Sequence, residues 1–375
     1  MIRTRLACYY GATFMMLGVL LPFWPVWLQS RGLDAEQIGI FMASGVVMKI
    51  VANPFVAHLA DKHGERKRLI ILLAGLSLLT FSLFALGQSF WSIVLINCLF
   101  VAFWSPAMPL QESLTTQSGA RFGFDYGRVR LWGSVTFIVS AVGIGHFLEG
   151  RSSDLIFTVI IFTLLLTLVA AFLLPDFRSP TSQQKRLPII DALKDKKFVA
   201  FLVGATLIQS SHAVMYGFGT LHWKQAGIGS DVIGWLWAEG VIVEIVLFIF
   251  GPQILSKIGP TRLIALAGLA GAIRWVGTGL TTDLSALIAL QALHGMTFGA
   301  AHLGAMHFIQ DRISPELSAT AQGLYSSVVT GVGMGITMYV SGYLYSNYEG
   351  QAYFAMGIMA AAGGIIFFLL RRKTV

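Results

Sequence analysis

Long apolar runs separated by short polar segments make up most of the chain, and this pattern predicts helices that cross a membrane. A run of about eighteen or more apolar residues with few charges is long enough to span a bilayer as an α-helix. By hydropathy and length we place twelve spans, at residues 6–28, 38–59, 69–87, 91–113, 129–148, 155–174, 198–218, 232–254, 262–281, 284–309, 317–345 and 351–370. The pattern therefore predicts an all-α, polytopic membrane protein.

Four prolines lie inside two of these spans. Pro22 and Pro25 fall in the first span, and Pro106 and Pro109 fall in the fourth. Proline lacks the backbone donor and disturbs the preceding helical turn, so we expect bends or breaks at both places. Inside a membrane, breaks are tolerated only where neighbouring helices or a cavity satisfy the freed backbone groups.

One long hydrophilic segment divides the spans into two sets of six. We predict an N-terminal six-helix bundle at residues 1–175, a cytoplasmic linker at 176–197 and a C-terminal six-helix bundle at 198–375. Two halves with six spans each have the same orientation in the membrane. This is the arrangement of parallel repeats in major facilitator transporters.

An internal repeat supports this division. A constant shift of 195 positions carries seven residues of the first half onto identical or similar residues of the second. Gly32, Ile38, Gly39, Gly45, Lys62, Gly64 and Lys67 map onto Gly227, Ile233, Gly234, Gly240, Lys257, Gly259 and Arg262. One offset that holds across two spans and their loop indicates a doubled module. We therefore expect the two bundles to be related by a pseudo-two-fold axis.

The charge pattern indicates orientation rather than nucleic-acid binding. The chain is 55% hydrophobic, has a mean hydropathy of +0.72 and carries a net charge of +8. Most of its 26 Lys and Arg residues fall in segments that an inside N-terminus would place in the cytoplasm. We therefore predict a multi-pass protein of the inner membrane with both termini in the cytoplasm, in contact with lipid and with no nucleic-acid partner.

Neither a cleaved leader nor a metal or cofactor is expected. Arg3 and Arg5 before the first apolar run resemble a secretory signal, but the run to Leu28 is too long for one. Cys8 and Cys98 both lie inside apolar runs, which favours neither a disulfide framework nor a metal cluster.

Five ionisable residues fall inside predicted spans: Lys49, Glu112, Glu239, Glu244 and Arg274. An ionised side chain at mid-bilayer costs about 2.5–3.5 kcal/mol even on a lenient insertion scale. Such residues need partners or water, and together they indicate a polar internal cavity.

Glu112 ends the fourth span, and Arg130 lies near the start of the fifth. One interpretation is a structural pair at two helix ends. The other is that Arg130 receives an acidic or hydroxyl group of a substrate and that Glu112 is its counter-ion. A planar guanidinium fork suits that task.

A second set of ionisable residues lies in the C-terminal half. Glu239 and Glu244 share one span but face about 140° apart, so both are not expected to face one cavity. Arg274 or Lys49 is the candidate partner of Glu244. His294, in the tenth span, is either a hydrogen-bonded core residue or a proton relay, because its ordinary pKa lies near neutrality.

Aromatic residues are numerous, and the candidates for the walls of a substrate cavity include Trp24, Trp132 and Tyr216. The alternative is that they pack in the core or form interfacial belts.

The segment 57–68 resembles the signature loop of the major facilitator superfamily. Asp61, Lys62, Gly64, Arg66 and Lys67 fit its pattern, and Ala57 replaces its leading Gly. The resemblance implies a loop that takes part in the conformational switch of transport.

More specifically, the chain resembles the phenylpropionate permease family and the lactose permease branch of proton symporters. The resemblance lies in residues 21–24, 125–135, 211–218 and 293–298. It implies substrate contact by Glu112 and Arg130 and proton coupling that involves Arg274 and His294. Where that branch has its proton-carrying carboxylate, this chain has Thr297, and the eighth-span acid falls on Val241 with Glu239 and Glu244 nearby.

We therefore predict a secondary active transporter, not an enzyme, that imports a small organic acid such as an aromatic carboxylate together with protons by alternating access. Arg130, Glu112, Trp24, Trp132 and Tyr216 would bind substrate. Glu244, Arg274, His294, Glu239 and Lys49 would couple protons. Proton-coupled uptake of a sugar or nucleoside remains an alternative, as does a membrane sensor that does not transport. A monomer is expected to suffice.

Overall fold

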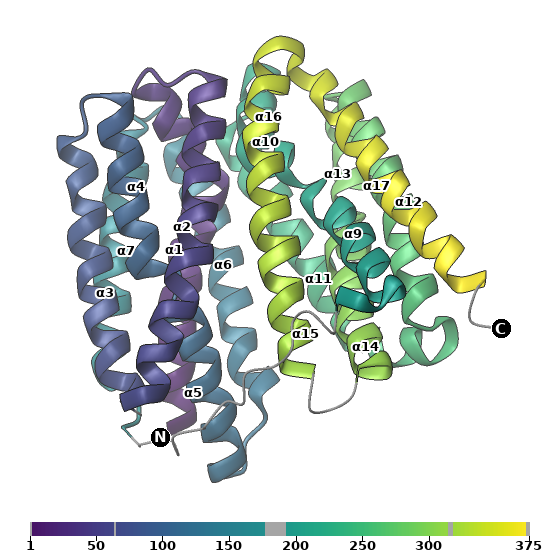
Figure 1. Ribbon diagram of the computed structural model, residues 1–375. Coiled ribbons are helices and arrows are strands. Elements are labelled where there is room, and N and C mark those ends of the chain that lie inside the picture. Colours follow the sequence, from purple (N-terminus) through teal and green to yellow (C-terminus); the bar gives the residue numbers. More distant parts are fainter. Residues whose placement is uncertain (1, 64, 177–192, 314–317, 373–375) are drawn as a thin grey trace. The chain divides into compact units, whose positions relative to one another are not determined.

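The computed structural model describes residues 2–63, 65–176, 193–313 and 318–372, without the side chains of 61, 63, 318–320, 371 and 372. Every regular element in these ranges is helical, and none is a strand (Figure 1). Eleven helices or helical stretches of this part of the chain are long and apolar enough to cross a membrane. The last of them, 321–370, covers the last two predicted spans. The predicted all-α membrane fold is confirmed.

The N-terminal half consists of α1 (Ile2–Ser30), α2 (Ala35–His63), α3 (Arg66–Ser82), η1 (Leu83–Leu86), α4 (Phe90–Trp104), α5 (Ala107–Phe122), α6 (Tyr126–Leu148) and α7 (Asp154–Leu173). The C-terminal half consists of α9 (Lys196–Ser210), α10 (Ala213–Gln225), α11 (Ser230–Ile258), α12 (Pro260–Leu280), α13 (Leu284–Ala292), η2 (Gly295–Ala300), α14 (Ala301–Arg312), α15 (Ser318–Tyr325), η3 (Ser326–Gly333), α16 (Met334–Tyr348), η4 (Glu349–Gln351) and α17 (Ala352–Arg372).

Tertiary contacts divide the chain into two compact units. The first unit contains residues 1–33, 44–184 and 229–235, and the second contains 34–43, 185–228 and 236–375. The start of α2 thus belongs to the second unit, and the start of α11 belongs to the first. The repeat is visible in the backbone, because Gly32 and Gly227 both have a left-handed φ, of 85° and 82°. That conformation strains residues with a Cβ, so the two equivalent loops each require glycine.

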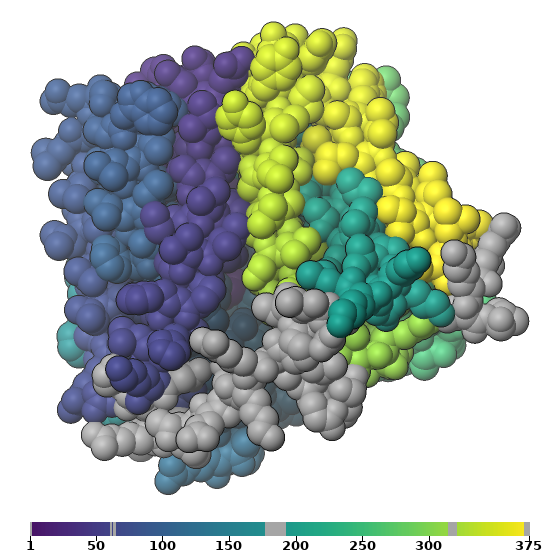
Figure 2. Space-filling view, viewed as in Figure 1, coloured from purple at the N-terminus to yellow at the C-terminus, as the bar shows by residue number. Residues whose placement is uncertain are grey.

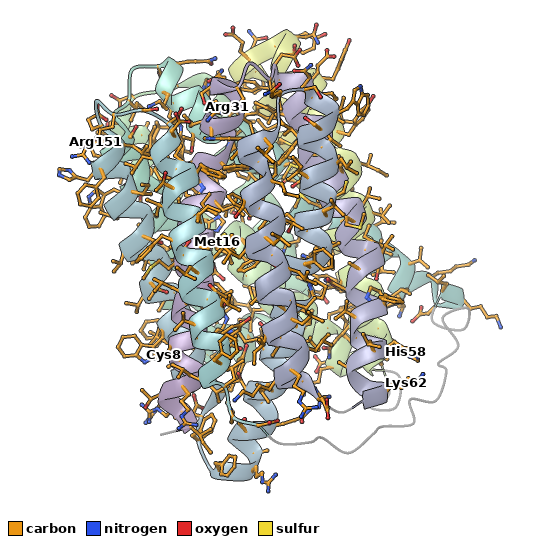
Figure 3. The ribbon with its side chains drawn as sticks, turned by 90° about the vertical axis from the view of Figure 1, so that its left-hand side faces the viewer. Cys8, Met16, Arg31, His58, Lys62 and Arg151 are labelled. Carbon is orange, nitrogen blue, oxygen red and sulfur yellow. The ribbon has the colours of Figure 1, made fainter. Side chains whose placement is uncertain are left out.

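In the first unit, α1 packs against α6 and α7, and α3 packs against α4 and α7. The core at one end of this unit is aromatic. Trp24 stacks on Trp27 with ring centroids 4.3 Å apart, and Phe81 and Phe84 close around them. Figure 3 shows Arg31 and Arg151 near one end of these helices and His58 and Lys62 near the other, as expected for charged residues that flank apolar spans.

In the second unit, α12 packs along α17. On its other side α17 lies against α9, as the teal and yellow surfaces show (Figure 2). Phe201, Phe308 and Phe367 are buried where α9, α14 and α17 meet. Two segments of this unit, η2 and η3, are π-helical, so each turn contains more residues than an α-helical turn.

The prolines of the first and fourth spans behave differently. Helix α1 continues through Pro22 and Pro25 to Ser30, so the first span is not broken. The fourth span is broken, because α4 ends at Trp104 and α5 begins at Ala107. The seventh span also contains a break, between Ser210 and Ala213, that no proline marks.

Candidate functional site

Polar and charged side chains gather at membrane depth in each of the two units. In the second unit the central residue is Arg274, in the middle of α12 and only 1% exposed. Its Nη1 donates to Nδ1 of His294 and to Oγ1 of Thr297, both at 2.9 Å. Its Nη2 donates to Oε1 of Gln291 at 2.6 Å. A buried arginine is thus held by neutral acceptors.

The hydrogen bonds around His212 have a defined direction. A carbonyl oxygen only accepts, so Nδ1 of His212, 3.1 Å from the Gln209 carbonyl, carries the proton. In the neutral ring Nε2 then accepts from the Thr297 hydroxyl, 3.1 Å away. Arg274, Thr297 and His212 therefore form a continuous chain of hydrogen bonds in the interior of the second unit.

Trp275 contacts both the guanidinium of Arg274 and the break in the seventh span. Its ring lies 4.4 Å from the guanidinium carbon of Arg274, and its indole N–H donates to Oγ of Ser211 at 2.9 Å. Cation–π contacts of this kind strengthen when they are shielded from water. Ser211 and His212 form the junction between α9 and α10, so this break places His212 beside Arg274.

The positive charge of Arg274 has no acid in direct contact among the residues that the structure describes. Its Nε has no hydrogen-bond acceptor there either. Glu239 acts on Arg274 only through its electrostatic field. A buried charge normally requires a direct partner, so this cluster has unused capacity for an anionic or hydrogen-bonding group.

The cluster of the first unit is formed around Arg130, in the second turn of α6. Its guanidinium carbon lies 4.0 Å from the centroid of Phe14 and 5.8 Å from that of Tyr10. Glu112 lies beside Tyr126 and within electrostatic range of Arg130. Over the described ranges, Arg130 forms neither a direct ion pair with Glu112 nor a hydrogen bond to another side chain. The structure therefore brings Glu112 and Arg130 into one cluster without pairing them.

The other predicted site residues lie in several places. Tyr216 joins the cluster of the second unit, with its ring 5.7 Å from His212 and 6.2 Å from Trp237. Glu244 lies on α11 within electrostatic range of Tyr216. Lys49 is exposed on α2, in the first unit.

Two predicted cavity-wall tryptophans lie elsewhere. Trp24 is buried in the aromatic core described above, and Trp132 is 53% exposed on α6. These environments favour packing for Trp24 and contact with the surroundings for Trp132.

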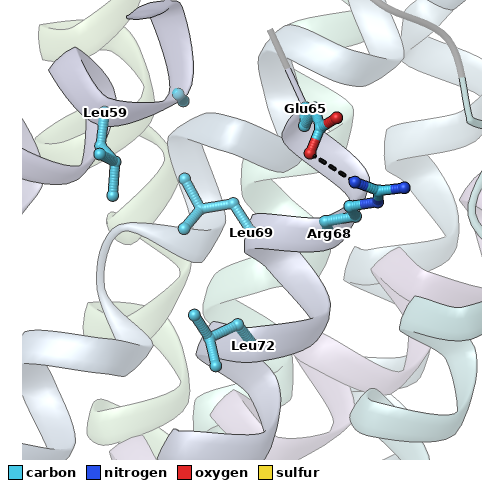
Figure 4. Close-up of a pocket in the computed structure, with 6 residues that line it drawn as sticks. Leu59, Glu65, Arg68, Leu69 and Leu72 are labelled. Carbon is cyan, nitrogen blue, oxygen red and sulfur yellow. Dashed lines mark hydrogen bonds and ion pairs between the residues drawn. The ribbon is translucent and has the colours of Figure 1, made fainter. Parts of the chain in front are cut away.

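The signature loop is described in part. Gly64 and the side chain of Asp61 lie outside the described residues, and Lys62 is exposed. Arg66 is buried and donates to Oε1 of Gln117 at 3.3 Å. The loop also borders a pocket with a volume of about 220 Å³. Glu65 and Arg68 line this pocket, and Glu65 accepts a hydrogen bond of 2.9 Å from Arg68 (Figure 4). Lys67 is half-buried at the start of α3.

Three members of the second-unit cluster are not among the site residues predicted from the sequence: His212, Gln291 and Thr297. Thr297 occupies the position where the lactose permease branch has its proton-carrying carboxylate. The one available signal was that 211–218 and 293–298 are among the segments that carry the family resemblance. In the described ranges no three His, Cys, Asp or Glu residues gather as a metal site.

Comparison with known proteins agrees with the fold. The model of the MFS_1 like family matches residues 3–356. A protein described as a probable 3-phenylpropionic acid transporter of Escherichia coli (strain K12) is 32% identical over 369 residues, which cover 95% of this chain and 94% of that protein. A maltose permease of Geobacillus stearothermophilus is 27% identical over 384 residues, which cover 99% and 95%. The crystal structure of the nucleoside transporter NupG superposes with a TM-score of 0.86 at 17% identity and covers 99% of both chains, which shows a shared fold.

Proposed function

Because the chain belongs to the MFS_1 like family, a family of secondary transporters and not of enzymes, we propose that it imports a small organic acid together with protons. The cargo is an aromatic carboxylate of the phenylpropionate type. The protein is a multi-pass protein of the inner membrane that acts on small molecules. We place both termini and the linker 176–197 in the cytoplasm, on the distribution of Lys and Arg. We take the monomer, with bundles at 1–175 and 198–375, as the working unit.

The observation that carries this proposal is the environment of Arg130. The ring centroid of Phe14 lies 4.0 Å from the guanidinium carbon, so an aromatic ring covers one side of the group. The N–H donors of the guanidinium have no acceptor in the described part of the chain. A carboxylate accepts two parallel hydrogen bonds from such a fork. The rings of Phe14 and Tyr10 offer an aromatic cargo a surface beside it.

Charge balance gives the reason for proton coupling. A membrane potential opposes the import of an anion by about 2.3 kcal/mol per charge per 100 mV. One proton that enters with a monoanion cancels that work, so at least one is needed for accumulation. Glu112, beside Arg130, keeps the empty site from carrying an isolated positive charge.

We assign proton coupling to the cluster of the second unit. Arg274, His294 and Glu239 carry the ionisable groups, and Thr297 and His212 extend them by hydrogen bonds. Glu244 and Lys49 remain candidates for the proton carrier on their membrane depth alone. Alternating access, the mode of transport of this fold, would expose the clusters to the two sides in turn.

Proton-coupled sugar uptake is the second candidate. It is supported by the 27% identity with a maltose permease over nearly the whole chain. In this case Glu112 would accept hydroxyl hydrogen bonds.

Uptake into proteoliposomes tests both candidates. With the outside acidified, the wild type is expected to accumulate labelled 3-phenylpropionate, and collapse of the pH gradient is expected to stop accumulation. Arg130→Lys keeps the charge but loses the planar fork. Loss of a charged hydrogen bond of about 1.5–3 kcal/mol predicts a fall in kcat/KM of about 10-fold to 150-fold.

Arg128→Lys is the matched control, because Arg128 is exposed in the first turn of the same helix. Accumulation of maltose without phenylpropionate would replace the first candidate by the second. Full activity of Arg130→Lys would remove Arg130 from the carboxylate site.

A further inference from the structure

We propose that a groove between α12 and α17 binds an anionic phospholipid, with the acyl chain in the groove and the phosphate at its basic end. The groove has a volume of about 730 Å³ and belongs entirely to the second unit. Its walls include Leu266, Leu269, Ile365 and Phe368, and its basic end is formed by Lys257 and Arg262. We call it the α12–α17 groove.

Small residues create the groove. The two helices approach so closely that a Cβ on Gly268 would lie 2.5 Å from Cα of Gly364. Ala265, Ala272 and Ala361 continue the floor on either side of this contact. Glycine and alanine side chains are too short to fill the surface above this line of contact. A channel therefore runs along the contact, and the larger apolar side chains form its two walls.

The walls are apolar and open. Leu266, Leu269, Ile365 and Phe368 are all exposed, although each lies on a helix that is apolar enough to span a membrane. In a bilayer such a surface is covered by hydrocarbon. An acyl chain that lies in the channel gains contact with both helices, which a flat helix surface does not offer.

The basic end determines the kind of lipid. Lys257 lies in the last turn of α11, Arg262 lies in the first turn of α12, and both are exposed. Neither has an acidic partner among the residues described by the structure. The N-cap Gly259 provides no side-chain cap for α12, so backbone N–H groups of the first turn are also available. Cations and a helix N-terminus together favour a phosphate.

The occupant has to match both features at once. A soluble anion would use the cations and leave the apolar walls uncovered, and a neutral lipid would leave the cations unpaired. A phospholipid with a net negative charge satisfies both. With the orientation proposed above, this end of the groove faces the cytoplasmic leaflet, where anionic lipids attract basic residues.

Native mass spectrometry of the purified full-length protein tests the proposal. The protein is titrated with phosphatidylglycerol and with phosphatidylcholine of identical acyl chains. The wild type is expected to retain phosphatidylglycerol preferentially. Each cation near an anionic surface contributes about a fivefold gain in affinity, so Lys257→Ala combined with Arg262→Ala is expected to lower phosphatidylglycerol affinity roughly 30-fold.

Two further variants define the site. Arg312→Ala removes an exposed cation of the same unit that does not line the groove, and it is expected to bind lipid like the wild type. Ala272→Phe fills the floor and is expected to release both lipids, with a thermal unfolding midpoint that shows the variant to be folded. Lys257→Arg combined with Arg262→Lys is expected to keep the preference for phosphatidylglycerol.

Three results would overturn the proposal. The first is equal retention of the two lipids by the wild type. The second is an unchanged preference in the double alanine variant. The third is displacement of phosphatidylglycerol by glycerol phosphate at equal concentration, which would mean that the headgroup alone is recognised and that the groove has no role.

Discussion

Arg274 donates a hydrogen bond to Nδ1 of His294 across 2.9 Å, and this bond requires that Nδ1 carry no proton. The guanidinium has donors only, so the imidazole nitrogen has to accept. His294 is consequently neutral in this arrangement, with its proton on Nε2. Protonation of Nδ1 would break the bond and place two positive charges side by side, so the arginine contact and the charge state of His294 depend on each other.

Substitution of His294 should separate its role as hydrogen-bond acceptor for Arg274 from its ability to take up a proton. Asn offers an oxygen near the position of Nδ1, so His294→Asn is expected to keep the Arg274 bond and the thermal stability while it loses any proton-dependent step. His294→Leu removes the acceptor from a charged donor and is expected to cost about 1.5–3 kcal/mol of stability. Thermal unfolding in detergent and gradient-driven uptake measure the two effects. Equal loss of stability in both variants would contradict the assigned acceptor role.

Trp275→Phe tests the contact between α12 and the break in the seventh span. Phenylalanine keeps a ring near Arg274 but has no indole N–H for Ser211, so we expect a loss of about 0.5–1.5 kcal/mol. Trp91→Phe is the control, because Trp91 is 71% exposed on α4 and its loss should change little. The unfolding midpoints of the two variants are compared directly, and similar values would mean that the indole bond is not needed.

Gly268→Ala probes the close approach of α12 and α17. The new Cβ would meet the backbone of Gly364, which cannot move away as a side chain could, so the helices must separate. Overpacking of this kind typically costs about 1–3 kcal/mol. Gly143→Ala is the matched control on α6, where a Cβ meets nothing within 4 Å. A stability of Gly268→Ala at or above the wild type would show that the helix contact is loose.

Asp283, which lies outside the membrane spans, is expected to make stability weakly dependent on pH. Its carboxylate accepts hydrogen bonds from the Ser285 hydroxyl and from the backbone N–H of Ala286, which lowers the pKa of Asp283. A lowered folded-state pKa gives stability that is complete above the ordinary value of about 3.9 and is lost as the pH falls through the lowered pKa.

Asp283→Asn keeps a good helix cap but does not titrate. We expect the thermal unfolding midpoint of the wild type to fall further than that of this variant between about pH 5 and about pH 3. Parallel pH curves for the two proteins would show that the cap does not contribute.

The sequence was sufficient for the fold because each span carries its own signal. A long apolar run predicts a spanning helix without knowledge of its neighbours, and the constant offset from Gly32 to Gly227 reveals the repeat. Proline was a less reliable guide. Pro106 lies at the break between α4 and α5, but α1 continues through Pro22 and Pro25. A helix can tolerate proline where its neighbours hold it, and the sequence does not show those neighbours.

The site was harder to predict because its bonds join distant residues. The periodicity of the seventh span gives no sign that α9 ends before His212, so this histidine resembled an ordinary core residue. Thr297 and Gln291 are uncharged and carry no signal of their own. Their role follows only from the position of Arg274, about twenty residues earlier in the chain.

His294 and Thr297 are the two acceptors of Nη1 of Arg274. The π-helical segment η2 begins directly after His294 and contains Thr297. A π-turn holds one residue more than the α-helical turn that it replaces, and each residue of a helix accounts for about 100° of rotation. Rewinding of η2 into a regular helix would therefore swivel α13 about its own axis relative to α14. We therefore expect a local change of winding, with no bend in the helix, to move His294 away from Arg274.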